Sequence, residues 1–267
     1  LGISEGDEVI MSPRTFVASA FSIMVLGARP VFVDIDRDTQ NIDPSLIEAA
    51  ITPKTKAIMA IHLAGWPCEM NKIQEICKEY NLYLIEDCAQ AHGAKYNGQS
   101  VGSFGDINGW SFCQDKIIST AGEGGMVTTN NKSLWEKVWS FKDHGKNYDT
   151  VYNKEHPPGF RWLHENYGTN LRMTEIQSAI GRLQLQKLDS WIEKRTHLAN
   201  IFNTAFENVD GLRVTISPAH IKHAYYKYYV FIEPNKLQDG KDRDFIMNSL
   251  NDLGIACYSG SCSEIYK

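Results

Sequence analysis

The sequence predicts an α/β protein, with a mostly parallel sheet flanked by helices and a smaller α+β region towards the C-terminus. Strand-like runs at residues 57–63 and 82–85 are apolar with almost no polar alternation, which is typical of strands buried on both faces. Amphipathic stretches separate these runs, as expected for helices that cover a parallel sheet. Beyond residue 206 short strands surround a single helix, so we expect a large domain over residues 1–205 and a small domain over residues 206–267.

Local composition predicts the elements of the large domain. β-branched and aromatic residues indicate strands at residues 8–11, 30–35, 57–63, 82–85, 109–112 and 126–129. Apolar residues at helical spacing indicate helices at residues 16–26, 44–50, 70–80 and 134–141. Residues 143–167 show no period and are expected to be irregular. One long helix follows, from residue 176 to about residue 206, and we expect Thr15 and Thr174 to cap the helices that they precede.

The small domain is expected to hold three short strands and one helix. The strands are expected at residues 212–214, 226–232 and 255–258, and the helix at residues 243–253. This pattern differs from the alternation of strands and helices before it, which is why we place the domain boundary near residue 206.

Composition and charge exclude several classes of function. The chain has 267 residues, of which 43% are hydrophobic and 22% charged, values typical of a globular protein. A net charge of −5 leaves no basic surface of the kind that neutralises a phosphate backbone, so we expect no nucleic-acid partner. No apolar run approaches the roughly 18 residues of a membrane span, and residues 1–7 lack the pattern of a signal peptide. We therefore expect no membrane partner.

The six cysteines are scattered and form no C-x-x-C pair. Reduced thiols in a cytoplasmic enzyme fit this pattern better than a disulfide framework does. His220, His223, Cys257 and Cys262 could be assembled into a zinc site on paper, but their spacings match no common zinc pattern. We therefore expect no metal.

The turn that follows residues 109–112 carries a candidate nucleophile, Lys116. Glycines at positions 122, 124 and 125 follow it, and glycines allow a ligand or another segment of backbone to approach closely. A lysine whose amine is desolvated in such a turn can form a Schiff base. A solvated surface lysine is the alternative that these residues leave open.

Asp87 comes directly after an apolar strand and is the second candidate. A buried carboxylate needs a partner, which could be the turn formed by residues 88–94 or a ligand. A carboxylate that faces a pyridine nitrogen keeps that nitrogen protonated, and pyridoxal phosphate (PLP) enzymes pair such a residue with a Schiff-base lysine. The residues alone leave both interpretations open.

Five motifs, in this order along the chain, resemble the signatures of one family. They are Ile-Glu-Asp-Cys-Ala-Gln-Ala-His-Gly-Ala at residues 85–94, Trp-Ser-Phe-Cys-Gln-Asp-Lys at 110–116, Gly-Glu-Gly-Gly at 122–125, Asp-His-Gly at 143–145 and Gly-Thr-Asn-Leu-Arg-Met-Thr-Glu-Ile-Gln at 168–177. Over essentially its whole length the chain is similar to the DegT/DnrJ/EryC1/StrS aminotransferases. The resemblance implies a fold-type-I enzyme that uses PLP and its pyridoxamine form (PMP), in a family that mostly aminates keto groups on nucleotide-linked sugars.

The resemblance also implies roles for the two candidates and for one neighbour. Lys116 is expected to form the Schiff base with the cofactor and to move the proton between the substrate carbon and the cofactor. Asp87 is expected to pair with the pyridinium nitrogen, and Gln90 to bond the phenolic oxygen.

Four further residues are expected, on the same resemblance, to hold the cofactor. Ala89 and Phe16 would pack on the two faces of its ring, although an aromatic residue in the first turn of a helix is more often part of the core. Ser111 would donate to the phosphate. Asn170 would reach the cofactor phosphate of the partner subunit across a homodimer interface, although alone it reads as a turn residue.

Two motif residues, His144 and Arg172, are less certain members of the site. Each can contact the substrate or have a solvated or structural role, and the sequence does not decide between these roles.

The resemblance predicts a PLP-dependent aminotransferase that transfers an amino group from glutamate to a keto-sugar nucleotide in surface-polysaccharide or amino-sugar biosynthesis. One alternative is a sugar dehydratase of the same family, but those enzymes carry histidine where this chain has Lys116. Another is a non-catalytic regulatory homologue, against which Lys116, Asp87, Gln90 and Ser111 argue.

The chain departs from the family pattern in two places. Family members carry an upstream Gly-Thr turn that binds the phosphate at a helix N-terminus, and no such turn precedes Glu8. We therefore expect both domains to be incomplete, with residues of a longer protein missing at each end. The second departure is Cys88, where the family often has alanine; we expect it to affect packing more than chemistry.

Overall fold

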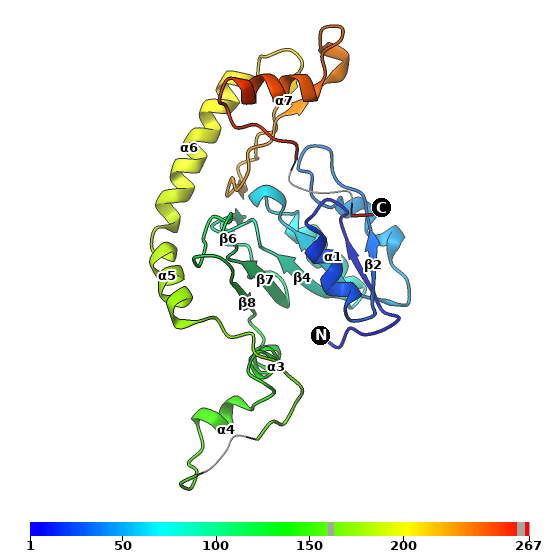
Figure 1. Cartoon of the computed structure of the whole chain (residues 1–267). Helices are drawn as coiled ribbons and strands as arrows, with labels where there is room; N and C mark the ends of the chain where they lie inside the picture. Colours follow the sequence, from blue (N-terminus) through cyan, green and yellow to red (C-terminus); the bar gives the residue numbers. More distant parts are fainter. Residues whose placement is uncertain (160–162, 261–264, 267) are drawn as a thin grey trace.

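The computed structural model of the chain (Figure 1) describes residues 1–159, 163–260 and 265–266. Its centre is a six-stranded sheet with the strand order β2-β1-β3-β4-β7-β8. These strands are β1 Glu8–Met11, β2 Arg29–Phe32, β3 Thr55–Ile61, β4 Tyr83–Asp87, β7 Ile107–Ser111 and β8 Gly125–Thr128. All adjacent pairs are parallel except β7 and β8, which are antiparallel. The predicted α/β class with a mostly parallel sheet is confirmed.

Helices cover both faces of the sheet, and each face has its own apolar cluster. On one face Met59 and Ile61 of β3 pack with Ala20 and Ile23 of α1 (Val17–Met24). On the other face β3 contributes Ile58 and Ala60, which pack with α2 (Met70–Glu79) through apolar residues that include Met70, Ile73 and Ile76. Because successive side chains of a strand point to opposite faces, a strand buried on both sides must be apolar at every position. This explains the unbroken apolar runs in the sequence.

Beyond the sheet, Figure 1 shows α3 and α4 extending away from it, while α5 and α6 run along one side of the molecule. These helices span Lys132–Lys142, Tyr148–Tyr152, Glu175–Leu185 and Leu188–Phe206. The predicted cap at Thr174 is confirmed, because its side chain and that of Gln177 form a reciprocal capping box. The single long helix is two helices, interrupted at Gln186 and Lys187, and the segment expected to be irregular contains α4.

Two other expectations within the large domain are wrong. Thr15 does not cap α1: the N-cap position is Phe16, with no side-chain hydrogen bond, and the Thr15 hydroxyl lies 2.8 Å from Ser19 Oγ instead. The helix expected at residues 44–50 is a pair of 3₁₀ turns, η1 (Pro44–Leu46) and η2 (Glu48–Ala50). A segment this short makes i→i+3 bonds as readily as a full α-helical turn.

Towards the C-terminus the prediction succeeded in part. Helix α7 (Arg243–Asp252) is confirmed, and β9 (Leu212–Arg213) pairs with β11 (Phe231–Ile232) in a two-stranded antiparallel sheet. Most of the strand expected at residues 226–232 is absent, because the backbone N–H groups of Tyr226 and Lys227 donate to the carbonyl of Ala64 and not to a strand. No strand forms at residues 255–258, where Ile255 and Tyr258 are 54% and 80% exposed and lack a partner strand.

Several short elements had no sequence signal. A three-stranded antiparallel sheet joins β10 (Ile221–Lys222), β5 (Lys95–Tyr96) and β6 (Gln99–Ser100). Two more 3₁₀ turns are η3 (Leu63–Gly65) and η4 (Pro234–Lys236). The division into domains at residue 206, where α6 ends, stays a prediction. No helix in the described part of the chain combines the length and apolar character needed to cross a membrane.

Candidate active site

The carboxyl edge of the central sheet brings the two candidate segments together. Asp87, the last residue of β4, is the register partner of Gly109 on the adjacent parallel strand β7. Ser111 ends β7 two residues later, so the turn that carries Lys116 leaves the sheet beside Asp87. In open parallel sheets this edge is where ligands bind.

Asp87 is held by two donors that come from different elements. Ser19 Oγ of α1 donates to Asp87 Oδ2 at 2.7 Å, and the backbone N–H of Ala89 donates to Oδ1 at 3.1 Å. An ionised carboxylate can accept about four hydrogen bonds, so two acceptor positions stay available. The side chain is therefore oriented by the protein and can still accept a proton-bearing group of a ligand.

Glu86, its neighbour on β4, is saturated instead. Its carboxylate accepts from the backbone N–H groups of Gly102, Phe104 and Gly105 at 2.7–2.8 Å. It also pairs with His62 Nε2 at 3.0 Å, and both side chains are fully buried. Burial acts to raise the pKa of Glu86, but the bond from His62 and the backbone donors outweigh it and the pKa lies below its usual value. Glu86 thus fixes the 102–105 turn to the sheet, a role that sequence reasoning missed.

Gln90 lies in the turn after β4 and is buried. Its Oε1 accepts from the backbone N–H of Ala64 at 2.6 Å. That bond fixes the orientation of the amide, because the oxygen must face Ala64, and the NH₂ group then points the other way as a donor. Gly65 is required beside it: φ is +95° there, and a Cβ would lie 2.9 Å from Ala224 Cβ and 3.0 Å from Gln90 O.

Ser111 and the turn after it are also oriented. Ser111 Oγ accepts from the backbone N–H of Cys113 at 3.3 Å, which leaves the hydroxyl proton free to be donated. The turn is closed by backbone bonds from Phe112 N to Gly124 O and from Thr120 N to Phe112 O. A Cβ on Gly124 would lie 2.3 Å from Thr120 Oγ1, so only glycine fits there.

Lys116 is sequestered in this turn, with its side chain 13% exposed. Nζ lies 4.0 Å from Asp115 Oδ1, at the limit of an ion pair, and 4.9 Å from the centre of the Tyr226 ring. Asp115 has a closer partner, because the Tyr226 hydroxyl donates to its Oδ2. That bond, above all, lowers the pKa of Asp115. The Lys116 amine therefore lies between the face of the Tyr226 ring and the Asp115 carboxylate, whose main hydrogen bond comes from Tyr226.

His92 is a buried histidine close to this lysine. Its ring centre lies 5.3 Å from that of Trp110 and 5.7 Å from that of Phe112. Burial and, to a lesser extent, the charge of Lys116 lower the pKa of His92 to about 4. The imidazole is therefore neutral at pH 7 and adds no positive charge near the lysine.

Comparison with known proteins shows the family of the chain. The model of the DegT/DnrJ/EryC1/StrS aminotransferase family matches residues 1–259. The chain belongs to this family. It is 42% identical over 253 residues to the GDP-perosamine synthase of Escherichia coli O157:H7, and the match covers 94% of this chain and 64% of that protein. The chain thus spans about two thirds of the length of this relative.

Two solved structures support the same assignment. An aminotransferase from Psychrobacter cryohalolentis is 52% identical, with a TM-score of 0.95, and the match covers 99% of this chain and 69% of that one. A putative sugar aminotransferase from Streptococcus pneumoniae, solved in its PMP form, is 26% identical, with a TM-score of 0.83 and a coverage of 96% and 68%. The fold-type-I aminotransferase architecture is therefore established for this chain.

The other residues singled out by the DegT/DnrJ/EryC1/StrS motifs lie in different surroundings. Phe16, at the start of α1, is 61% exposed, so the expectation that it is ordinary core does not hold. Ala89 lies two residues after Asp87, and its backbone N–H donates to the Asp87 carboxylate. Asn170 is exposed and pairs in an isolated bridge with Asp143. Among the described residues no hydrogen bond links Asn170 to Asp87, Gln90, Ser111 or Lys116.

Arg172 belongs to a cluster of cations around Asp143, which is 7% exposed. Arg172 Nη1 and Lys146 Nζ each lie 3.2 Å from Asp143 Oδ1, and Lys142 lies 3.4 Å from Oδ2. Burial acts to raise the pKa of Asp143, but these cations outweigh it and lower the pKa. The cluster gives Arg172 a structural partner. His144 adopts a positive φ of 58°, and its carbonyl lies 2.6 Å from His164 Nδ1.

The zinc set considered from the sequence is not assembled. Cys262 lies outside the described residues, and His220, His223 and Cys257 form no group with metal-ligand spacing among the residues that are described. In that part of the chain the metal-like group is His62, Glu86 and Cys88. His62 Nδ1 accepts from the backbone N–H of Cys68, and burial raises the pKa of the Cys88 thiol well above its usual value. Both ring nitrogens of His62 and the Glu86 carboxylate are thus hydrogen-bonded within the protein, and the Cys88 thiol is held in its neutral form.

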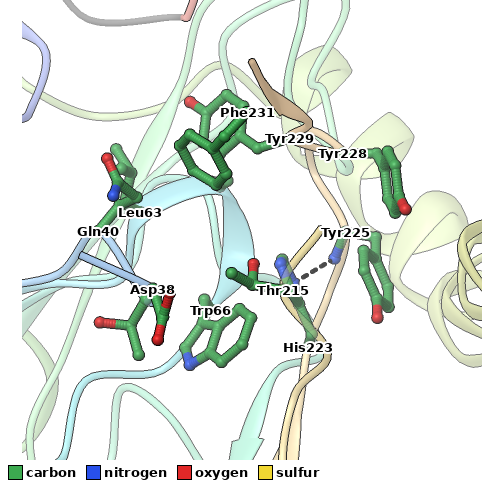
Figure 2. A pocket seen from close by; sticks show the side chains of 12 residues that line it. Asp38, Gln40, Leu63, Trp66, Thr215, His223, Tyr225, Tyr228, Tyr229 and Phe231 are labelled. Carbon is green, nitrogen blue, oxygen red and sulfur yellow. Dashed lines mark hydrogen bonds between the residues drawn. The ribbon is translucent and has the colours of Figure 1, made fainter. Parts of the chain in front are cut away.

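A small aromatic pocket is lined in part by Gln40 and by Leu63 and Ala64 of η3 (Figure 2). Its lining includes Trp66, His223 and Tyr228, and Figure 2 shows Trp66 and His223 side by side with Tyr228 further away. The cavity volume of about 20 Å³ has room for about one water molecule. The pocket is too small in this conformation to hold a nucleotide sugar.

Proposed function

We propose that this chain forms the PLP site of an aminotransferase that transfers an amino group from glutamate to a keto-sugar nucleotide, in the synthesis of amino sugars for surface polysaccharides. The proposal is supported by the placement of Asp87, Gln90, Ser111 and Lys116 on the two segments that end or follow the adjacent strands β4 and β7 at the carboxyl edge of one sheet. The family implies PLP and PMP, and the relatives named above include a sugar aminotransferase in its PMP form.

The donors and acceptors at this edge fit PLP one by one. Asp87 offers an open carboxylate for the protonated ring nitrogen, and Gln90 offers an NH₂ donor for the phenolic oxygen. Ser111 has a hydroxyl proton to donate to a phosphate oxygen. Phe16 is exposed enough to pack on the ring, and Ala89 is small enough to allow close contact on the other face.

When bound, PLP supplies an electron sink that stabilises a carbanion at the substrate carbon. The protein residues do the rest. Lys116, which is 13% exposed, would hold the cofactor covalently, and its amine, once the incoming substrate amine has replaced it, would take up and return the proton at the reacting carbon. Asp87 keeps the proton on the ring nitrogen, because its negative charge disfavours loss of that proton. Ser19 and Ala89 keep the carboxylate in place during these steps.

Both substrates of this reaction are anionic, and one cation of the site region has unused donors. Arg14 lies two residues before Phe16, with its guanidinium 5.5 Å from the centre of the Tyr229 ring. Its Nε is buried without a hydrogen-bond partner in the described part of the chain. Arg14 can therefore donate to a carboxylate or phosphate oxygen of a substrate.

The decisive experiment uses the full-length protein and glutamate alone. Wild type should convert bound PLP to PMP, with the corresponding change in absorbance, and Lys116→Ala should lose this half-reaction. Lys72→Ala, which changes an exposed lysine of α2, is the matched control and should behave as wild type. A Lys116→Ala variant that still reacts with glutamate would contradict the assignment.

The substrate class is tested by the second half-reaction. The PMP form of the full-length protein is mixed with a panel of keto-sugar nucleotides and with simple ketones, and the return of PLP absorbance is followed. We expect sugar nucleotides to react fastest. If a ketone that is not a sugar were aminated in preference to every sugar nucleotide, the substrate assignment would be wrong while the aminotransferase assignment stood.

A further inference from the structure

A chain of buried hydroxyl groups leads from the start of α1 to Asp87. Thr15 Oγ1 lies 2.8 Å from Ser19 Oγ, and Ser19 Oγ lies 2.7 Å from Asp87 Oδ2. Thr15 is 2% exposed and Ser19 is 8% exposed. The contact joins residues 68 positions apart in sequence, so it forms only when α1 packs on the face of the sheet that ends in Asp87.

The direction of the hydrogen bonds in this chain follows from donor and acceptor counts. An ionised carboxylate only accepts, so the single hydroxyl proton of Ser19 goes to Asp87. Ser19 then has no proton left for Thr15, and the Thr15 hydroxyl must donate to Ser19. Charge-assisted bonds are roughly twice as strong as neutral ones, and each bond in such a chain polarises the next.

We propose that Ser19 and Thr15 form a relay that positions Asp87 for the cofactor, a role that rests on the function proposed above. Ser19 fixes Oδ2 from the α1 side while the Ala89 N–H fixes Oδ1. The carboxylate cannot rotate without losing one of the two bonds, so its open acceptor positions face a constant direction. Thr15 acts only through Ser19, because its hydroxyl makes no bond to Asp87 itself.

The behaviour of a neighbouring serine shows that this contact is not the usual one for a helix. Helical serines commonly bond a backbone carbonyl one turn earlier, as Ser22 does with the carbonyl of Ser19 at 2.7 Å. Ser19 instead gives its proton to a carboxylate on another element. Ser22 lies on the same helix and is exposed, so it provides a matched control.

The test measures the equilibrium dissociation constant of PLP for the full-length protein by absorbance titration. We expect Ser19→Ala to weaken binding about tenfold, in line with the loss of one bond to a charged group. Thr15→Val, which keeps the shape of the side chain, should weaken it about threefold. The double variant should bind as Ser19→Ala does, because Thr15 has no route to Asp87 without Ser19. Independent, multiplying effects of the two changes would overturn the relay.

Two further variants separate positioning from general packing. In an Asp87→Ala background, Ser19→Ala should leave the PLP dissociation constant unchanged, whereas a packing defect would weaken binding in both backgrounds. Ser19→Thr, which restores a hydroxyl, should recover most of the affinity, and Ser22→Ala should match wild type. If wild type itself binds no PLP, the proposed function fails together with the relay. If wild type binds PLP and Ser19→Ala binds it equally well, only the relay fails.

Discussion

Glu86 and Asp87 are consecutive carboxylates on β4, yet they face opposite sides of the sheet and differ in every contact. Glu86 is fully buried and accepts from three backbone N–H groups and from His62. Asp87 is partly exposed at the carboxyl edge and accepts from only two donors. The strand's two-residue period produces this difference.

The comparison separates a carboxylate that holds the fold from one that can serve a ligand. Glu86 has all its acceptor positions filled by the protein, so it stabilises the native state and has nothing to offer a substrate. Asp87 keeps acceptor positions open at the edge where parallel sheets bind ligands. Both side chains are carboxylates, so their chemical type does not distinguish them. The number of hydrogen-bond acceptor positions that the protein leaves unfilled does.

The largest effect is expected for Glu86→Ala, which leaves three buried N–H groups and His62 without an acceptor. We expect the free energy of unfolding to fall by about 3–5 kcal/mol, because each unpaired buried donor costs about 1–3 kcal/mol and the loop relaxes in part. Urea denaturation measures this. Glu75→Ala, at an exposed position of α2, should change stability by less than about 0.5 kcal/mol. A loss of less than about 1 kcal/mol for Glu86→Ala would contradict the structural role of Glu86.

Asp87→Asn should show the reverse behaviour. We expect the rate of the glutamate half-reaction to fall by about a hundredfold or more, because the charge that holds the proton on the cofactor ring is lost. Stability should fall by about 1 kcal/mol at most, since the amide can still accept one of the two bonds. Stopped-flow absorbance and urea denaturation of the same preparation give both numbers. Equal losses of stability for Asp87→Asn and Glu86→Ala would break the distinction.

The buried histidines affect stability over a higher range of pH than the Glu86 carboxylate does. Burial lowers the pKa of His223 to about 3 and, with Lys116, that of His92 to about 4, against about 6.5 in the unfolded chain. Between pH 6.5 and about 4 the unfolded state binds more protons, so stability falls as pH falls. Each histidine should lower the free energy of unfolding by about 1.5 kcal/mol as the pH falls from 6.5 to 5. The contribution of Glu86, whose pKa is lowered, is lost only below its usual value of 4.5.

One substitution tests whether His223 stays neutral in the folded protein. His223→Phe should flatten the dependence of unfolding free energy on pH between 6.5 and 5, whatever its effect on stability at pH 7. His197→Gln, at an exposed position of α6, should leave the slope as in wild type. An unchanged slope for His223→Phe would mean that this histidine does not stay neutral in the folded protein.

The smallest effect concerns a third carboxylate, Asp115, beside Lys116. Tyr226→Phe removes the hydroxyl that donates to Asp115 and should destabilise the protein by about 1 kcal/mol. Because Asp115 then loses its hydrogen bond from Tyr226 and keeps Lys116 as an ion-pair partner, we expect the ion pair to tighten and the glutamate half-reaction to slow by a few fold. Denaturation and single-turnover kinetics test this together. A faster reaction in Tyr226→Phe would show that the tyrosine restrains the lysine in some other way.

Most of the central sheet could be predicted from the sequence, and the small strands could not. The runs at residues 57–63 and 82–85 carry a signal because burial on both faces makes every position apolar. β5, β6 and β10 have two residues each, too few for a period to appear. The expected strand at residues 226–232 failed for a different reason: its backbone bonds a loop 160 residues earlier in the chain, and composition does not encode such a partner.

The sequence by itself determined the family, the sheet and the positions of Asp87 and Lys116, because strand periodicity and motif order are local properties of the chain. Tertiary structure alone decided which distant donors bond Asp87, Gln90 and Asp115. Ser19, Ala64 and Tyr226 come from three other elements, and each meets its partner only through packing of the helices and turns on the sheet. Hydrogen-bond partners 26 to 111 residues apart leave no periodic trace in a single sequence. The difference between a structural Glu86 and an open Asp87 therefore became visible only in the folded protein.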